Sequence, residues 1–301
     1  MLNTIIGAPG SIKRNKAYFI MAIFLPVVLL FIIVRVIPII STLSMSFTNY
    51  HMQRPVTKFV GFQNFSRLIK DDIFLISFRN SLQFVLIAFP AEIILGLVIA
   101  LMLNNRLRAE GYFQTLFFIP YILPMVPAAI IWQWIYAPGN FGLANFFLES
   151  IGFQRVSWLI NSKIALNAII VMHIWKNLGF FVVIFLVGLK DIPNDFKEAA
   201  LVDGANTWQR IWRVELPIMK PVILFSSVMA SIWALSAFTE VYIMTQGTDV
   251  STGVEISVLV FQIYVEGFRY FRMGYSSAIS LILFGVSMLL VLVQFRLFRE
   301  K

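Results

Sequence analysis

The chain has no cysteine and few charged residues. Asp, Glu, Lys and Arg together make up 13% of its 301 residues, about half the share that is usual in soluble domains. The lack of cysteine excludes disulfides, thiolate chemistry and cysteine-based zinc sites. The two histidines, His51 and His173, lie too far apart in the sequence to suggest a local metal-binding motif. Hydrophobic residues reach 59% and the mean hydropathy is +0.83, which is the composition that contact with lipid requires.

The charge that is present is mostly positive, with a net value of +9. In a soluble protein this excess would suggest nucleic-acid binding. In a membrane protein it has a simpler cause, because Lys and Arg accumulate in loops that stay in the cytoplasm. We therefore expect a lipid membrane, and no nucleic acid, as a partner of this chain.

Six segments are long and apolar enough to cross a membrane as helices, since about 20 residues span about 30 Å of hydrocarbon. They cover about residues 17–43, 79–103, 111–136, 163–189, 219–245 and 274–298. The first segment follows a basic stretch, as in a secretion signal, but it is too long for one and no small-residue cleavage site follows. The sequence therefore predicts an all-α membrane protein with a single transmembrane domain over residues 1–301.

An even number of spans places both termini on the same side of the membrane. If that side is the cytoplasm, thirteen Lys and Arg residues fall inside and nine outside, and Arg35 and Lys176 within spans complete the 24. The positive-inside rule favours this orientation, because much of the outside charge lies in a long loop that weighs less. We expect a multi-pass protein of the cell membrane with cytoplasmic N- and C-termini.

Two loops on the outer side have features of short surface helices. Residues 44–78 mix aromatic side chains such as Phe59 and Phe62 with charged ones, as an amphipathic element at the membrane surface would. Residues 137–161 open with the turn signal Ala137-Pro138-Gly139-Asn140 and then alternate apolar and polar residues. We expect both loops to be available to a partner outside the cytoplasm.

The segment between the fourth and fifth spans, residues 192–217, predicts a short helix, a break and a second short helix. Pro193 ends the preceding span, and Asp195 followed by Glu198 has the spacing of a capping box that begins a new helix. Gly204 interrupts this helix, because glycine lowers helix stability and readily adopts non-helical conformations. The result is a compact element at the membrane surface.

Thr207 can begin the second helix of this segment, and Leu216-Pro217 then turns the chain into the fifth span. Small residues let the backbone of a partner approach closely, and Glu198 and Asp203 can make charge-assisted hydrogen bonds to that partner. The element therefore suits mechanical coupling to a soluble protein. From spacing alone, an amphipathic loop that rests on lipid headgroups is an equal alternative.

Parts of this segment resemble the EAA loop of binding-protein-dependent ABC importer permeases. The matching residues, in order and spacing, are Glu198-Ala199-Ala200, Asp203-Gly204-Ala205 and the terminal Leu216-Pro217. In that family the loop is a coupling helix that inserts into a cleft on the ATP-hydrolysing subunit, so the resemblance implies this role for Glu198 and Gly204. It also implies the type I importer permease fold, with six transmembrane helices and a cytoplasmic coupling loop between helices 4 and 5.

Further motifs resemble the sugar-permease branch of this family, of the type seen in maltose, multiple-sugar and glycerol-phosphate importers. They are Phe117-Phe118-Ile119-Pro120-Tyr121, Trp132-Gln133-Trp134, Ile174-Trp175-Lys176-Asn177-Leu178-Gly179-Phe180 and Gly274-Tyr275-Ser276-Ser277-Ala278. The resemblance covers about residues 17–298 and implies a carbohydrate substrate. One departure is Thr245-Gln246-Gly247-Thr248-Asp249, where the family commonly has a turn richer in glycine and proline, and this leaves the exact sugar open.

The resemblance also implies partners at the cell inner membrane: a second, related permease, two ATP-binding subunits and an extracytoplasmic solute-binding protein. This chain has no G-x-x-x-x-G-K-[ST] phosphate-binding loop, so ATP and Mg would be bound by a partner subunit. We expect no cofactor, metal site or catalytic residue in the chain itself. The alternative from another class is a secondary transporter or channel that works alone, which broken helices and inverted repeats would indicate.

Among the ionisable residues inside the expected spans, where charge is costly and often functional, we weigh four. Arg35 lies in the outer part of the first span and can extend to the interface, so we favour a structural role for it. Glu92 in the second span can pair between helices, with function and packing equally favoured. Lys176 and Glu240 lie in the outer halves of the fourth and fifth spans and are candidates for contact with the substrate.

By resemblance, five positions on the fourth and fifth spans correspond to sugar-contacting positions in maltose-type permeases. Here they are Asn177, Phe180, Ala230, Trp233 and Ala234. An aromatic ring stacked on a sugar, with an amide bonding its hydroxyls, makes a sensible carbohydrate site, although packing is an equal alternative for Phe180 and Trp233. His173 and Lys176, on one helix face, could favour an acidic or phosphorylated sugar, but a Lys here is also common in permeases for neutral sugars.

Overall fold

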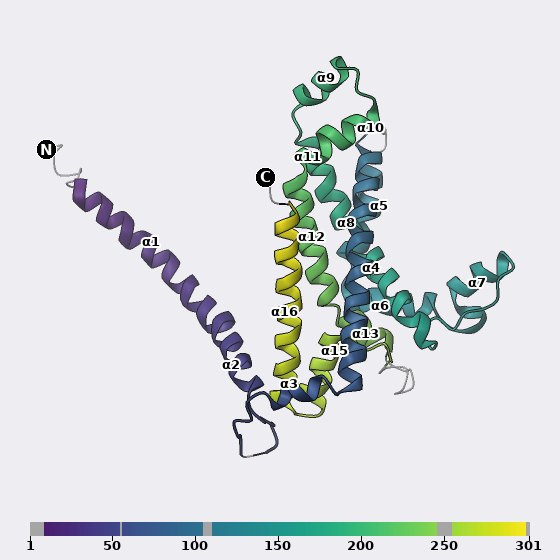
Figure 1. The fold of residues 1–301 in the computed structure, drawn as a ribbon. Coiled ribbons are helices and arrows are strands. Elements are labelled where there is room, and N and C mark those ends of the chain that lie inside the picture. Colours follow the sequence, from purple (N-terminus) through teal and green to yellow (C-terminus); the bar gives the residue numbers. More distant parts are fainter. Residues whose placement is uncertain (1–8, 55, 105–109, 246–254, 299–301) are drawn as a thin grey trace.

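A computed structural model describes residues 9–54, 56–104, 110–245 and 255–298 of the chain. Over these ranges the chain is helical, apart from loops and one antiparallel bridge between Thr48 and Phe59. The long helices stand side by side in a bundle, with α3 at one end and α9 at the other (Figure 1). These two ends are named the α3 end and the α9 end. Residues 246–249, part of the departure noted above, lie outside the described ranges.

Five helical spans are long and apolar enough to cross a membrane, and they match five of the predicted ones. They are α1 (Pro9–Phe31) continuing through the π-helical η1 (Ile32–Val36) into α2 (Ile37–Ser46), α4 (Asp72–Leu103), α8 (Ser162–Lys190), α12 (Lys220–Leu235) with α13 (Thr239–Thr245), and α16 (Met273–Phe298). α4 begins earlier than the predicted residue 79, because the Asp71 carboxylate accepts hydrogen bonds from the backbone N–H groups of Ile73 and Phe74.

The third predicted span is not one straight helix. α5 (Glu110–Ile122) and α6 (Met125–Ile135) meet at a bend of 98°. Pro124 causes the break, because proline lacks an N–H group and disfavours helical geometry at the residue before it, Leu123. The prediction of a single helix over residues 111–136 was therefore wrong in geometry, and the described chain has six spans only if this bent pair counts as one.

The fifth predicted span, residues 219–245, is interrupted as well. α12 ends at Leu235 and α13 begins at Thr239, and Ser236 has left helical geometry with φ −95° and ψ 8°. Neither proline nor glycine marks this break in the sequence. The break places Glu240 in the first turn of α13, where unpaired N–H groups favour a negative charge.

α8 packs against α4 and α5, and α4 packs in turn against α12. Phe181 and Phe185 of α8 are fully buried in this core. Two glycines allow the close approach: a Cβ on Gly96 of α4 would lie 2.9 Å from that of Phe181, and one on Gly179 of α8 would overlap the Phe117 carbonyl of α5. At these two points the backbones meet so closely that only glycine fits.

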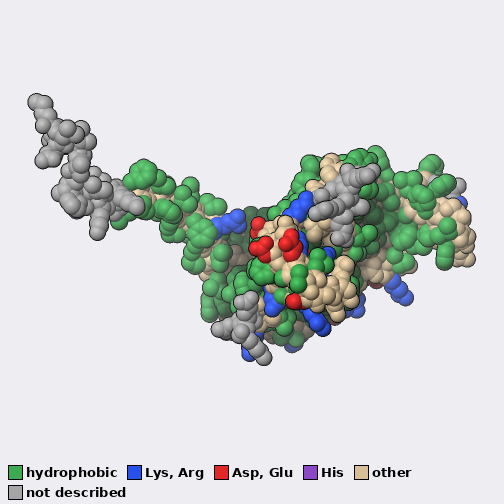
Figure 2. Space-filling model, turned by 90° about the horizontal axis from the view of Figure 1, so that it is seen from above, with side chains coloured by type: hydrophobic (Ala, Val, Ile, Leu, Met, Phe, Trp, Pro, Cys, Tyr) green, Lys and Arg blue, Asp and Glu red, His purple; other side chains and the backbone are tan. Residues whose placement is uncertain are grey.

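α1 diverges from the bundle (Figures 1 and 2). The apolar side chains of the span Tyr18–Ser46 are mostly exposed, and its contact with the bundle comes from α2, which packs against α16. Arg35 lies in η1 and is exposed. A long apolar helix held away from its own bundle leaves space beside it for lipid or for another chain.

Short helices occupy both predicted surface loops. α3 (Gln63–Leu68) lies in the 44–78 loop, while η2 (Gly139–Phe141) and α7 (Leu143–Ser150) lie in the 137–161 loop, as expected. α15 (Leu259–Tyr264) and the π-helical η4 (Val265–Arg269) precede α16. α7 projects from the bundle on the side opposite to α1 (Figures 1 and 2), so the 137–161 loop extends the molecule beyond its core.

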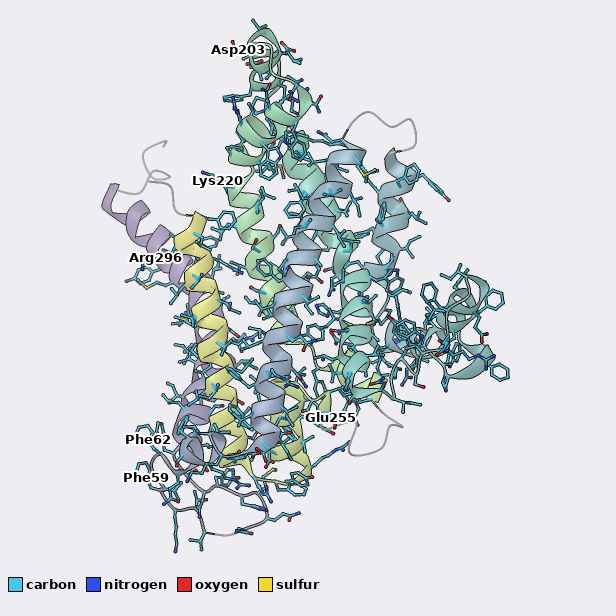
Figure 3. The ribbon with its side chains drawn as sticks, turned by 45° about the vertical axis from the view of Figure 1, so that its right-hand side comes forward. Phe59, Phe62, Asp203, Lys220, Glu255 and Arg296 are labelled. Atoms are coloured by element: carbon cyan, nitrogen blue, oxygen red, sulfur yellow. The ribbon has the colours of Figure 1, made fainter. Side chains whose placement is uncertain are left out.

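The 192–217 segment forms the α9 end, with Asp203 at its tip (Figure 3). It comprises α9 (Asn194–Val202), α10 (Thr207–Arg210), the π-helical η3 (Ile211–Glu215) and α11 (Leu216–Ile218). Gly204 adopts a left-handed conformation, with φ +75°, between α9 and α10. The predicted arrangement of helix, glycine break and second helix is therefore present.

The start of each short helix in this segment differs from the prediction. α9 follows Pro193 without a side-chain cap, so the predicted capping box at Asp195 and Glu198 is wrong. A capping box is found instead at α10, where Asn206 and Gln209 accept hydrogen bonds from each other's backbone N–H groups at 2.8 and 2.9 Å. The chain thus fixes the helix after the Gly204 break and leaves the first turn of α9 uncapped by side chains.

Gly179→Ala is expected to lower the thermal stability of the chain, because the added methyl group meets the Phe117 carbonyl and forces α5 away from α8. We expect a loss of about 2 kcal/mol, read from the melting temperature of the detergent-solubilised protein. Gly285→Ala in α16 is the matched control, since a Cβ there has no atom within 4 Å. Equal melting temperatures for the two variants would contradict the close packing of α5 on α8.

Candidate functional site

A cavity of about 330 Å³ lies between the two helix breaks. Its lining residues are Tyr121, Met125, His173, Asn177, Trp233, Ser236, Ala237, Thr239 and Glu240. Tyr121 and Met125 flank the bend between α5 and α6, and Ser236 and Ala237 belong to the break between α12 and α13. The two interruptions of regular helix therefore shape this cavity.

Three aromatic rings gather on one side of the cavity. The centroid of the Tyr121 ring lies 5.2 Å from that of Phe180 and 6.2 Å from that of Trp233, and Phe180 lies 4.8 Å from Trp233. Tyr121 and Trp233 belong to the lining, whereas Phe180 contacts both rings without belonging to it. The rings offer a stacking surface for a flat, apolar face of a ligand.

A row of polar side chains adjoins these rings, with His173 at its centre. His173 Nδ1 donates to Glu240 Oε1 at 2.6 Å, and the Asn177 amide donates to His173 Nε2 at 3.1 Å. A carboxylate can only accept, so the Nδ1 atom of His173 carries the hydrogen of the bond to Glu240. All three residues are buried, and the row joins α8 to α13.

Glu92 approaches the opposite side of His173 from α4. Its Oε1 lies 3.6 Å from His173 Nε2, which is too long for a hydrogen bond. Glu92 is fully buried, and its carboxyl oxygens have no hydrogen-bond partner among the residues that the structure describes. Glu92 of α4 therefore lies beside His173 of α8, as the expected pairing between helices implies, but without a hydrogen bond to it. In the described ranges, no group of three or more His, Cys, Asp or Glu side chains is placed to hold a metal ion.

Lys176 is bound to the end of α5. Its Nζ donates to the Tyr121 carbonyl at 2.8 Å and lies 5.0 Å from the centroid of the Tyr121 ring. Tyr121 is in the last turn of α5, where carbonyl groups lack a partner within the helix, so the Lys176 ammonium acts as a C-terminal cap. Lys176 does not belong to the cavity lining.

Of the candidate substrate residues Asn177, Phe180, Trp233, Lys176 and Glu240, the structure brings three, Asn177, Trp233 and Glu240, to the cavity wall. The other two, Phe180 and Lys176, lie in the layer behind it, and both contact Tyr121. The two alanines that the resemblance placed at sugar-contacting positions, Ala230 and Ala234, are buried in the packing between helices and take no part in the lining.

Tyr121, Ser236 and Thr239 line the cavity although sequence reasoning did not select them. For Tyr121 a signal was available, because Pro120 and Pro124 on either side of it indicate a helix end. For Ser236 and Thr239 no such signal exists, since the break between α12 and α13 contains neither proline nor glycine.

The 192–217 segment carries the second set of candidate residues, all on one projecting element. Glu198, Ala199, Asp203, Gly204 and Pro217 are exposed, Ala205 and Leu216 are partly buried, and Ala200 is buried. Seen from the α9 end, acidic side chains stand near the centre of this face, with Lys and Arg side chains around them (Figure 2). The segment therefore presents an acidic surface with a basic surround.

A cavity of about 590 Å³ lies at the base of this segment, lined by Asn104, Lys190, Asn194, Lys197, Glu198, Leu201, Arg210 and Glu215. Lys197 Nζ donates to the Leu189 carbonyl, near the end of α8, at 3.2 Å. Arg210 Nε donates to the buried Glu215 carboxylate at 3.0 Å. One bond attaches α9 to the end of α8, and the other braces α10 against η3 within the segment.

The α3 end contains a third cavity, of about 950 Å³, which is lined by Gln63, Ser66, Arg67, Lys70, Asp71, Asp72, Ile73, Glu266, Tyr270 and Arg272. Glu266 accepts hydrogen bonds from Gln262 and Arg272, each at 3.3 Å. Burial raises the pKa of Glu266, although the guanidinium groups of Arg272 and Arg67 oppose this rise. This end therefore offers a concave surface with charges of both signs.

Comparisons with known proteins agree on the class of molecule. A family model described as "Binding-protein-dependent transport system inner membrane component" matches residues 92–300. The chain is 33% identical over 289 residues to the trehalose/maltose transport system permease protein of Thermococcus litoralis, and the match covers 96% of this chain and 95% of that protein.

Two solved structures share the fold. One is a bacterial ABC transporter involved in the import of the acidic polysaccharide alginate; its chain matches with a TM-score of 0.81 and 25% identity, over 96% of this chain and 97% of that one. The other is a bacterial alginate ABC transporter in complex with an alginate pentasaccharide-bound periplasmic protein, with a TM-score of 0.80, 26% identity and 96% of each chain covered.

His173→Ala is expected to destabilise the chain, because it removes the donor to Glu240 and leaves two buried carboxyl groups facing a void. We expect a loss of about 3 kcal/mol, measured as a lower melting temperature in detergent. His51→Ala is the matched control, since His51 is only half-buried and lies outside this polar row. An unchanged melting temperature for His173→Ala would contradict the structural importance of the row.

Proposed function

Because the chain belongs to the binding-protein-dependent transport system inner membrane components, the permease subunits of ABC importers, we propose that it carries a carbohydrate across the inner membrane. In this proposal it forms the translocation path with a second permease. Two separate ATP-binding subunits hydrolyse ATP with Mg, and an extracytoplasmic solute-binding protein delivers the substrate. Membership of this family supports the importer over a stand-alone secondary transporter or channel.

The observation that carries the carbohydrate assignment is the cavity between the helix breaks. It combines the aromatic faces of Tyr121 and Trp233 with the Asn177 amide and the Glu240 carboxylate. Sugars present apolar ring faces and hydroxyl edges, which aromatic rings and hydrogen-bonding groups complement. The substrates named for the similar proteins, trehalose or maltose and alginate, are carbohydrates as well.

The position of α1 supports a second permease beside this chain. α1 diverges from its own bundle with its apolar side chains exposed, and the cavity lining comes from α5, α6, α8, α12 and α13 with the link between the last two. A related bundle packed against this one would cover α1. Helix association in membranes relies on such packing of complementary surfaces.

The 192–217 segment supports coupling to an ATP-binding subunit. It projects from the bundle, exposes Glu198 and Asp203, and joins α8 directly to α12, two helices that line the cavity. In the proposed orientation the α9 end is cytoplasmic, as are both termini. The α3 end, with its short helices and charged cavity, then faces the solute-binding protein, in keeping with the periplasmic partner named for one similar structure.

Purification from native membranes tests this assembly. We expect the chain to be recovered with a second permease and an ATP-binding subunit. Proteoliposomes containing that complex should take up a saccharide only with ATP inside and the solute-binding protein outside. Uptake by the chain alone, without nucleotide, would overturn the proposal.

Gly204→Val is expected to uncouple uptake from ATP hydrolysis. A β-branched residue at φ +75° costs about 1–2 kcal/mol and distorts the turn between α9 and α10. Glu198→Ala should act in the same direction by removing an exposed carboxylate that meets the partner. The measurement is uptake and ATP hydrolysis by the reconstituted complex.

Gly152→Val is the matched control for this test. Gly152 has a similar φ of +86° and, like Gly204, has no atom within 4 Å of an added Cβ, but it lies in the 137–161 loop. Its strain should leave coupling intact. Unaltered uptake and ATP hydrolysis in Gly204→Val and Glu198→Ala would count against the coupling role.

Trp233→Ala and Asn177→Ala are expected to weaken uptake while the complex still assembles. Loss of a stacking face or of an amide hydrogen bond should raise the apparent KM by about tenfold. Trp134→Ala is the control, since Trp134 is 71% exposed and lies outside the cavity lining. Wild-type kinetics in both cavity variants would remove these residues from the substrate site.

A further inference from the structure

The cavity lining holds a carboxylate but no Lys or Arg. Among the described lining residues, Glu240 is the acidic one, His173 is bonded to it, and no Lys or Arg belongs to the lining. Glu92 stands behind His173 without a hydrogen bond from any described residue. A ligand in this cavity therefore meets the Glu240 carboxylate without a Lys or Arg side chain among the described lining residues.

Lys176 does not supply that cation, although it lies one turn from His173 on α8. Its ammonium donates to the Tyr121 carbonyl at 2.8 Å and lies over the Tyr121 ring, so its nearest partners are the end of α5 and an aromatic face. Moving Lys176 toward a ligand would leave a backbone carbonyl at a helix end without its partner, which is costly in an apolar surrounding. Lys176 thus serves the helix break and not the cavity.

His173 does not supply it either. Its Nδ1 lies 2.6 Å from Glu240 Oε1 and its Nε2 lies 3.1 Å from the Asn177 amide, so both ring nitrogens are engaged within the polar row rather than with a ligand. The hydrogen bond orients the Glu240 carboxylate but leaves its charge in place. The free lone pairs of that carboxylate remain available to accept hydrogen bonds from hydroxyl groups.

We propose that this cavity selects uncharged saccharides and rejects sugar acids, with Glu240 as the residue that sets this selectivity. The inference rests on the proposed carbohydrate function and names its substrate class. Sugar hydroxyls donate to the Glu240 carboxylate, whereas a uronate or sugar phosphate places a second negative charge against it. Similarity of fold does not carry substrate charge with it, since the similar transporter imports an acidic polysaccharide.

The physical reason is the low dielectric constant of the site. Two like charges a few ångströms apart repel far more strongly there than in water, and an added buried anion needs a partner that this chain does not offer. Discrimination of this kind works by making the wrong ligand unfavourable rather than by improving contacts to the right one.

The test uses proteoliposomes that contain the complete complex, with ATP inside and the solute-binding protein outside. The probes are matched saccharide pairs, in which a neutral oligosaccharide is compared with the same compound oxidised to a uronate at one primary hydroxyl. Pairs are chosen so that the binding protein binds both members, and uptake is measured with that protein saturated, so its own preference cancels. We expect the neutral member to be taken up faster by about tenfold or more.

Two variants assign the effect to the cavity. Glu240→Gln keeps a side chain that can bond His173 but removes the charge, and should reduce the preference to within about threefold. Ser236→Lys adds a cation at an exposed position of the lining and should raise uptake of the uronate, which provides a gain of function if Glu240→Gln assembles poorly. Glu255→Gln is the matched control, since Glu255 is exposed and does not line the cavity, and it should keep the wild-type preference.

The possible outcomes distinguish a failure of the proposed selectivity from a failure of the proposed carbohydrate function. Equal or faster uptake of the uronate by the wild-type complex, or a preference that both cavity variants leave unchanged, would overturn the selectivity and leave the carbohydrate function standing. Uptake of neither member of any pair, while the loaded binding protein still stimulates ATP hydrolysis, would overturn the carbohydrate function and the selectivity with it.

Discussion

A helix that crosses lipid must satisfy its backbone hydrogen bonds internally, and this constraint decides where the bundle can depart from regular helix. Two interruptions of helix within the predicted spans border the cavity: the bend between α5 and α6, and the break between α12 and α13. Side chains from neighbouring helices bond backbone groups of the helices that these breaks separate. Lys176 donates to the Tyr121 carbonyl, and Gln133 of α6 donates to the Ile243 carbonyl of α13 at 2.7 Å. These bonds make an interrupted, hollow region tolerable inside an apolar bundle.

The buried polar row depends on the same interruptions. Glu240 can meet His173 because the break turns α13 so that its first turn faces α8. The Phe84 ring lies edge-on to His173 at 5.0 Å and closes the row on its apolar side. In such surroundings a polar group is costly unless it is paired, so each member relies on its neighbours. Glu92, which has no hydrogen bond within the described chain, relies most on its proximity to His173.

The sequence predicted what hydropathy and local spacing control. Five spans and the Gly204 break follow from long apolar runs and from the conformational freedom of glycine. The bend between α5 and α6 is marked in the sequence by Pro124. The prediction gave more weight to the long apolar run of residues 111–136. The break after Leu235 had no such signal, because neither proline nor glycine marks it. Asn177 and Trp233 could be placed at a cavity by resemblance. Ser236 and Thr239 adjoin the unmarked break, so their place in the lining could be found only from the structure.

The arrangement of the chain joins the two candidate sites mechanically. The 192–217 segment connects the last residue of α8 to the first of α12, and these helices carry His173, Asn177 and Trp233. Lys197 bonds the end of α8, and the bond between Arg210 and Glu215 braces the part of the segment that leads to α12. Close-packed helices move as rigid bodies more easily than they bend. In the coupling that we propose, a displacement of the α9 tip would reach the cavity as a relative movement of α8 and α12, so that its aromatic and polar walls separate or close together.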